Sequence, residues 1–111
     1  MTRAEPDAEA FVAMAERLAR LDPRLSLLQA GLLAAVHLDI AHDSRSFARL
    51  LGIEHALVLR EITALCEAGD LLAVTRRDER TMRTFFAPGT GGGRLLSVLH
   101  SVDTLPVPPA G

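Results

Sequence analysis

Hydrophobic and polar residues alternate along the first half of the chain with the period of an α-helix. Residues 11–21 contain one apolar stripe at helical spacing, made by Phe11, Met14, Leu18 and Leu21. Pro6 suits the beginning of this helix, and Asp22-Pro23 ends it. A second helix is predicted over about 26–40, with Ser26 as its N-cap. Because this helix is apolar almost all round, it should lie at the centre of the fold.

Two shorter amphipathic segments follow. The first, "DSRSFARLLG", can be capped by Asp43 or Ser44 and ends at Gly52. Its inward-facing residues should be Phe47, Leu50 and Leu51. The second runs from residue 54 to about residue 68 and is stopped by Gly69. It should direct three residues to the core: Val58, Ile62 and Leu65.

The remaining pattern changes from helical to strand-like. "DLLAV" (70–74) and "TFFAP" (84–88) are short strand candidates, and the arginine-rich segment between them is predicted to be a hairpin connection. "GTGGG" (89–93) has the composition of a flexible link, and "RLLSVLHSV" (94–102) that of a short amphipathic helix. Residues 103–111 should be a flexible tail.

This order of elements predicts a mainly α fold with a small β-hairpin, of the winged helix-turn-helix type. The N-terminal helix, residues 1–24, is expected to serve dimerisation, and residues 25–88 should form the DNA-binding part. Residues 89–102 would then hold the glycine-rich link and the last helix. With 111 residues, the chain is long enough for one modest core.

The distribution of charge separates the two halves. All twelve basic residues are arginines, and the net charge is -2. Residues 1–43 carry four arginines against seven acidic residues, whereas residues 44–94 carry eight against six. The N-terminus lacks the order of a signal peptide, and polar residues interrupt the longest apolar run, 25–41. We therefore expect a cytoplasmic protein without a membrane span.

Several stretches resemble the MarR family of bacterial regulators over about 25–96. They are "LSLLQAGLLAAV", "SRSFARLLGIEHALVLREITALCEAGDLL", the Asp-x-Arg at Asp78-Glu79-Arg80, and "PGTGGGRLL". The resemblance implies a homodimer that binds double-stranded DNA, with the fourth helix in the major groove and the hairpin as a wing in the minor groove. It also implies an unidentified small-molecule effector.

Candidate DNA contacts on the fourth helix lie opposite its core face: His55, Ala56, Leu59, Arg60 and Thr63. His55 and Arg60 can donate to guanine edges or phosphates, and Ala56 and Leu59 can touch thymine methyl groups. The resemblance favours Arg60, because the family has an arginine at the matching position. His55 can also be interpreted as an ordinary exposed histidine.

The third helix and the hairpin supply the other candidates. Ser44, Arg45, Ser46 and Arg49 suit contacts with the DNA backbone, as do Arg76, Arg77 and Arg83. By resemblance, Arg80 would enter the groove, with Asp78 holding its side chain. In the alternative interpretation the hairpin is a solvated loop whose acidic residues neutralise two arginines, and Arg45 and Arg49 pair across a solvated face.

Dimerisation would use apolar residues of the first and last helices, namely Phe11, Met14, Leu18, Leu21, Leu95, Leu96 and Leu99. The rival hypothesis is a winged helix that binds proteins, which Glu54, Leu57, Leu59 and the overall acidity favour.

Other chemistry finds little support in the sequence. His37 and His42 have no further metal ligands in register, so we expect no metal site, and no cofactor motif is present. Cys66 should be a small core residue, with a redox-sensing thiol as the alternative. No catalytic arrangement has a supporting strand–loop context, so an enzyme is not expected.

Overall fold

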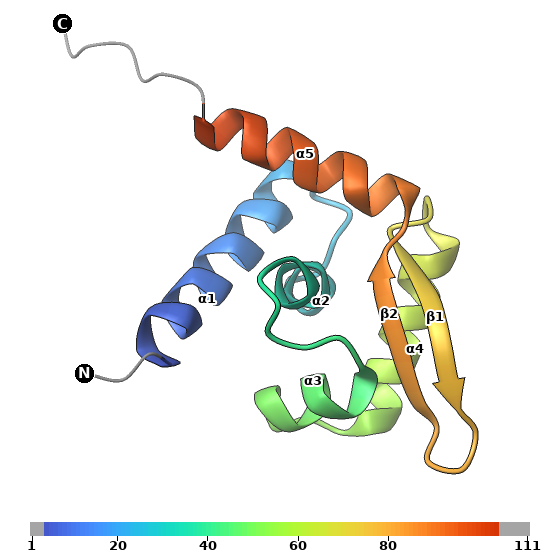
Figure 1. The fold of residues 1–111 in the computed structure, drawn as a ribbon. Coiled ribbons are helices and arrows are strands. Elements are labelled where there is room, and N and C mark those ends of the chain that lie inside the picture. The colour runs from blue at the N-terminus through green and yellow to red at the C-terminus, as the bar shows by residue number, and fades with distance from the viewer. Residues whose placement is uncertain (1–3, 105–111) are drawn as a thin grey trace, which may run out of the picture.

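The computed structural model describes residues 4–104, with five helices and one antiparallel pair of strands in this range (Figure 1). The elements are α1 (Ala4–Leu21), α2 (Leu27–His37), α3 (Ser44–Leu51), α4 (His55–Glu67), β1 (Leu72–Asp78), β2 (Arg83–Pro88) and α5 (Thr90–Thr104). The predicted mainly α class with a β-hairpin is confirmed. Most of the predicted tail, residues 105–111, lies outside the described residues.

Helix α2 lies at the centre, as its all-round apolar pattern predicts, and Figure 1 shows it end-on between α1 and the hairpin. All residues from Ala30 to Val36 are buried. The predicted cap at Ser26 is confirmed, because its hydroxyl accepts a 3.1 Å hydrogen bond from the Gln29 backbone N–H. The Gln29 side chain in turn accepts from the Ser26 N–H, which completes a capping box.

Helices α3 and α4 follow their predicted signals closely, with one exception. Asp43 caps α3, and Gly52 ends it in the left-handed conformation with φ 67°. The predicted core face of α4 is confirmed, since Val58, Ile62 and Leu65 are all buried. The exception concerns the end of α3, where Leu50 and Leu51 are 51% and 36% exposed.

The inward orientation predicted for Leu50 and Leu51 is therefore wrong. Phe47, in the middle of α3, is fully buried, but the last turn of the helix points away from the hairpin (Figure 1). The helix ends in a left-handed cap at Gly52, and its last turn stays largely exposed.

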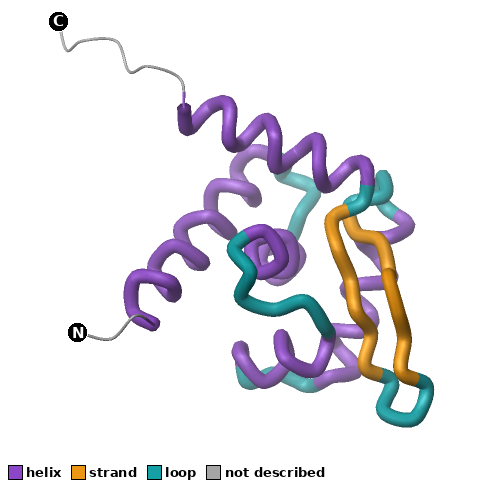
Figure 2. Tube along the Cα trace, viewed as in Figure 1, coloured by secondary structure: helices purple, strands orange, loops and turns teal. Residues whose placement is uncertain are grey.

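The hairpin strands are longer than predicted. Register pairs run from Leu72↔Pro88 to Asp78↔Arg83, so Arg76 and Arg77 belong to β1 rather than to the connection. Only residues 79–82 connect the strands, at the hairpin tip in Figure 2. Pairing with β2 extends β1, because ladder hydrogen bonds outweigh the weak strand preference of arginine.

The predicted flexible link at residues 89–93 is also wrong, because α5 begins at Thr90. These glycines pack against the turn that precedes β1. A Cβ atom on Gly91 would lie 2.0 Å from the Gly69 carbonyl oxygen, and one on Gly92 would lie 2.0 Å from that of Leu71. We call this contact between residues 69–71 and 89–92 the glycine junction.

Asp70 holds the glycine junction together. Its carboxylate accepts a 3.0 Å hydrogen bond from the Thr90 N–H, and its carbonyl oxygen accepts one of 3.0 Å from the Gly91 N–H. The first turn of α5 thus finds acceptors for its N–H groups on another segment. Within residues 4–104, no helix has the length and apolar character needed to cross a membrane.

Candidate nucleic-acid interface

The candidate residues on α3, at the beginning of α4 and on the hairpin gather at the end of the molecule opposite α5 (Figure 1). Hydrogen bonds join these three elements directly. Ser44, the first residue of α3, accepts a 2.9 Å bond from the Thr84 backbone N–H of β2. Its hydroxyl oxygen also lies 2.6 Å from His55 Nε2 at the beginning of α4.

Ser44 cannot be a DNA contact, which corrects the sequence prediction. Its side chain is completely buried, and its hydroxyl is used within the chain. Burial also excludes Ser44 and His55 as a nucleophile and base, because no substrate can reach the serine. The role of Ser44 is to connect α3, α4 and β2.

His55 lies against Ser44 in a partly buried position. The Ser44 oxygen accepts from the Thr84 N–H, and the same hydroxyl can act as either donor or acceptor toward His55 Nε2. Burial lowers the pKa of His55, and the positive charge of Arg45 lowers it further, against an opposing effect of Asp43. The ring is only partly exposed, so His55 is not an ordinary exposed histidine.

Asp43 forms a second polar centre beside Ser44. It accepts hydrogen bonds of 2.9 and 2.8 Å from the backbone N–H and the hydroxyl of Ser46, and Arg83 Nε lies 3.5 Å from its carboxylate. Burial raises the pKa of Asp43, but the Ser46 hydrogen bonds and the Arg83 charge outweigh it and lower the pKa overall. Ser46 and Arg83 are thus partly committed to contacts inside the chain.

The hairpin tip is held by side chains. The Asp78 carboxylate accepts a 3.0 Å hydrogen bond from the Arg80 backbone N–H. Asp78 therefore supports the backbone of the turn, whereas the sequence analysis expected it to hold the Arg80 side chain. The Thr81 hydroxyl accepts 3.2 Å from the Arg83 N–H. Arg45 Nη2 donates a 2.8 Å bond to the Thr81 carbonyl, so this arginine braces the tip from α3.

The hairpin arginines differ in their surroundings. The Arg76 guanidinium lies 4.2 Å above the centre of the Phe85 ring, a cation–π contact that leaves Arg76 exposed. Arg77 Nε donates a long bond of 3.4 Å to the Thr84 hydroxyl. Arg80 is exposed at the tip. The alternative in which Asp78 and Glu79 neutralise two of the arginines stays open, with Asp78 bonded to the Arg80 backbone.

On α4, Ala56, Arg60 and Thr63 are open to a partner, whereas His55 and Leu59 are half-buried. The Thr63 hydroxyl donates a 3.1 Å bond to the Leu59 carbonyl. The exposed candidates on the three elements are Arg45, Arg49, Ala56, Arg60, Thr63, Arg76, Arg77 and Arg80.

One residue at this end was missed by the sequence reasoning. Met82 is 49% exposed at the hairpin tip and adopts the left-handed conformation, with φ 62°. An apolar residue within a short polar connection was the signal that could have found it.

Of the residues predicted for dimerisation, three lie in the core of the single chain: Leu18, Leu96 and Leu99. They pack there because α1 lies against α2 and α5, so they are not available to a partner, which corrects that part of the prediction. Phe11, Met14 and Leu95 are partly buried, and Leu21 is exposed. The dimer itself stays a prediction.

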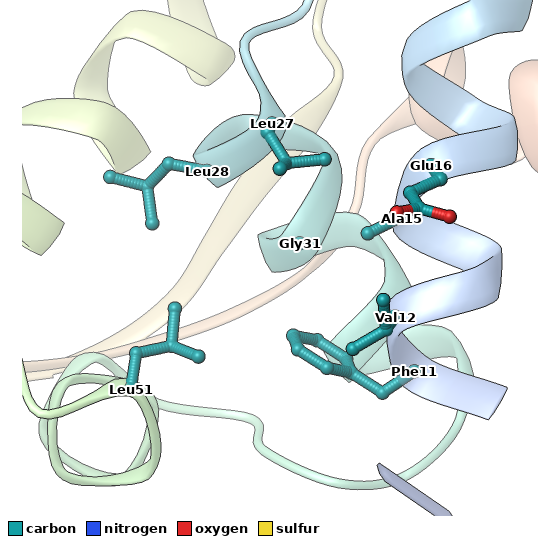
Figure 3. Close-up of a pocket in the computed structure, with 8 residues that line it drawn as sticks. All are labelled: Phe11, Val12, Ala15, Glu16, Leu27, Leu28, Gly31 and Leu51. Atoms are coloured by element: carbon teal, nitrogen blue, oxygen red, sulfur yellow. The ribbon is translucent and has the colours of Figure 1, made fainter. Parts of the chain in front are cut away.

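A groove of about 240 Å³ opens between α1, α2 and the end of α3 (Figure 3). Its lining is almost wholly apolar and consists of Phe11, Val12, Ala15, Glu16, Leu27, Leu28, Gly31 and Leu51. Leu51 of α3, which was predicted to face the core, lines one wall of this groove instead. The effector implied by the family resemblance also stays a prediction.

The remaining candidates have simple structural roles. Cys66 packs partly buried against the core, as predicted, and burial raises the pKa of its thiol, which makes it less reactive. His42 contacts the Asp39 carboxylate at the surface. Among the described residues, no three potential metal ligands cluster. Leu57 is half-buried, like Leu59, so neither forms the open apolar surface that the protein-binding hypothesis assumed.

Comparison with known proteins gives no relative for this chain: no protein-family model matches the sequence, and no curated protein matches it significantly.

Proposed function

We propose that this protein is a cytoplasmic transcriptional regulator of the winged helix-turn-helix type that binds duplex DNA as a homodimer. Helix α4 enters the major groove, and the hairpin acts as a wing in the adjacent minor groove. The observation that carries this proposal is the hydrogen bonding of Ser44 to both His55 and Thr84, which fixes α4 and the hairpin relative to each other.

A fixed relative position matters because two neighbouring grooves must be contacted at once. The Arg45 bond to the Thr81 carbonyl extends the same connection to the hairpin tip. Helix and wing can therefore bind without first ordering a loop, which reduces the entropy lost on association.

The distribution of charge also supports DNA binding by α4 and the hairpin. The chain is acidic overall, yet residues 44–94 carry eight arginines against six acidic residues. Arg60 on α4 and Arg76, Arg77 and Arg80 on the hairpin are exposed at or near this end of the molecule. Phosphate contacts from such arginines supply affinity, and an arginine at a guanine edge supplies specificity.

The test is a gel-shift with the full chain and the DNA upstream of its own gene, at two salt concentrations, beside a random duplex. Arg60→Ala should lose roughly 1–3 kcal/mol on the true site and little on random DNA. Arg94→Ala is the matched control, because Arg94 is an exposed arginine on α5, at the opposite end. Equal binding by the Arg60 variant and the parent would remove α4 as the reading helix.

The second candidate function is a winged helix that binds another protein. The apolar groove and the exposed Val12, Leu27 and Leu50 near it favour this alternative. It predicts that neither upstream DNA nor random duplex shifts at the lower salt concentration, where phosphate contacts are strongest.

A further inference from the structure

Met82 occupies the hairpin tip in a conformation that its side chain does not favour. With φ 62°, its backbone is in the left-handed region, where glycine or asparagine is the usual residue of a hairpin connection. Its side chain is nevertheless about half exposed, so it contributes little to the core. Folding alone therefore does not account for methionine at this position.

The tip presents this side chain on a well-held backbone. The Met82 carbonyl accepts a 3.1 Å bond from the Thr84 hydroxyl, and Thr84 is itself buried. On the other side, the Thr81 carbonyl is bound by Arg45 from α3. Single exposed apolar residues are common on protein surfaces, but few sit in a strained and braced turn.

The charges around Met82 indicate the kind of partner. Arg80, two residues before it, is exposed at the tip, whereas Arg83, directly after it, is half-buried with its Nε 3.5 Å from Asp43. The open guanidinium beside the apolar tip is therefore that of Arg80. The minor groove of DNA attracts arginine by its negative potential. Proteins that bind there frequently insert an apolar side chain, including methionine, between two base pairs. An uncharged, apolar protein surface would match Met82 but not the neighbouring arginine.

We propose that Met82 is a wedge that enters the minor groove, partly unstacks one base step and kinks the duplex beneath the hairpin. The inference rests on the proposed DNA-binding function and adds an element of specificity to it. Flexible pyrimidine–purine steps unstack most easily, so a TA or CA step should be preferred at the wedge, with A·T pairs around it for the arginines.

The experiment compares the full-length parent with Met82→Leu, Met82→Asn and Met82→Gly. The duplex carries 2-aminopurine at the expected TA step and a fluorescent donor and acceptor at its ends. The parent should raise 2-aminopurine fluorescence and bend the duplex by roughly 20° or more. Met82→Leu keeps an apolar wedge and should retain both signals.

Met82→Gly and Met82→Asn should lose the bend and the fluorescence rise, and bind about tenfold more weakly, the size of one lost base contact. Their thermal midpoints should equal or exceed that of the parent, because both residues suit a positive φ. The slope of log affinity against log salt should not change, since no phosphate contact is removed.

Two outcomes distinguish a failure of the Met82 proposal from a failure of the proposed DNA-binding function. If the Met82→Gly variant binds and bends the duplex as strongly as the parent, the proposed role of Met82 is wrong, but the proposed DNA-binding function is unaffected. If the parent binds no duplex, both fail together.

Discussion

The two ends of the β-hairpin are built in opposite ways. At the base, the glycine junction brings backbone atoms together so closely that positions 91 and 92 have no room for a Cβ. At the tip, the Asp78 and Thr81 side chains accept hydrogen bonds from the backbone, the Thr84 hydroxyl donates one to it, and other side chains project into solvent. The packing at the base thus requires residues without a Cβ, whereas the conformation of the tip requires particular polar side chains.

The comparison separates stability from binding within one element. A change at the base should affect folding first, because it alters how α5 joins the hairpin. A change at the exposed tip should leave folding nearly intact and alter only what the tip contacts. Substitutions at the two ends of the hairpin should therefore differ in which property they change.

The glycine junction should be the most sensitive site. Gly92→Ala places a Cβ 2.0 Å from the Leu71 carbonyl oxygen and should lower the free energy of unfolding by about 3 kcal/mol, as overpacking against a fixed backbone does. Urea denaturation measures the change. Gly93→Ala is the control, since nothing lies within 4 Å of its Cβ, and it should be neutral or stabilising by up to about 1 kcal/mol. Similar losses in both variants would show that the close approach of Gly92 to the Leu71 carbonyl does not decide the effect.

The connection between the helices and the tip should come next. Ser44→Ala leaves the Thr84 N–H buried without its acceptor and should lower the free energy of unfolding by about 1–3 kcal/mol. Ser97→Ala, at an exposed position on α5, should change it by less than about 0.5 kcal/mol. Equal stability of the two variants would mean that the bond from Thr84 contributes nothing.

The exposed arginines should act on DNA and not on folding. Arg76→Ala and Arg77→Ala should each weaken binding to specific and random duplexes alike, and flatten the slope of log affinity against log salt by about 1. Their free energies of unfolding should stay within about 0.5 kcal/mol of the parent, because both side chains are exposed. Fluorescence anisotropy across a salt series gives the slopes. Unchanged slopes for both would leave the hairpin as a solvated loop.

The smallest effect should come from pH. The pKa of His55 is lowered from its usual 6.5, so the unfolded chain binds a proton where the folded chain does not. The contribution of His55 to stability is therefore complete above pH 6.5 and decreases as the pH falls below it. His55→Gln should flatten the loss of stability between pH 7 and pH 5, as measured by thermal unfolding. His37→Gln, at an exposed position, should keep the slope of the parent.

Local signals in the sequence predicted the framework well. Ser26, Asp43 and Gly52 were recognisable as caps because each acts on residues within one turn of itself. The buried face of α4 followed from helical spacing alone. These features depend on neighbours in the sequence, so they could be predicted without knowledge of the fold.

The features that could not be predicted depend on distant residues. Ser44 bonds to Thr84, forty positions away, and a serine at a helix start gives no sign of such a partner. The glycines of residues 89–93 have the composition of a linker, but the contacts that require Gly91 and Gly92 come from the Gly69 and Leu71 carbonyls, about twenty positions earlier. A glycine-rich composition suggests a flexible segment. The close contact with residues 69–71 removes that flexibility in the folded chain.

The glycine junction also limits how this sequence can evolve. Glycine is the one amino acid without a Cβ, so every missense change at codons 91 and 92 adds an atom where the Gly69 and Leu71 carbonyls already lie. Position 93, next in the same run, has open space and can accept other helix-forming residues. The three consecutive glycines should therefore differ in tolerance: substitution should be harmful at positions 91 and 92 and acceptable at position 93.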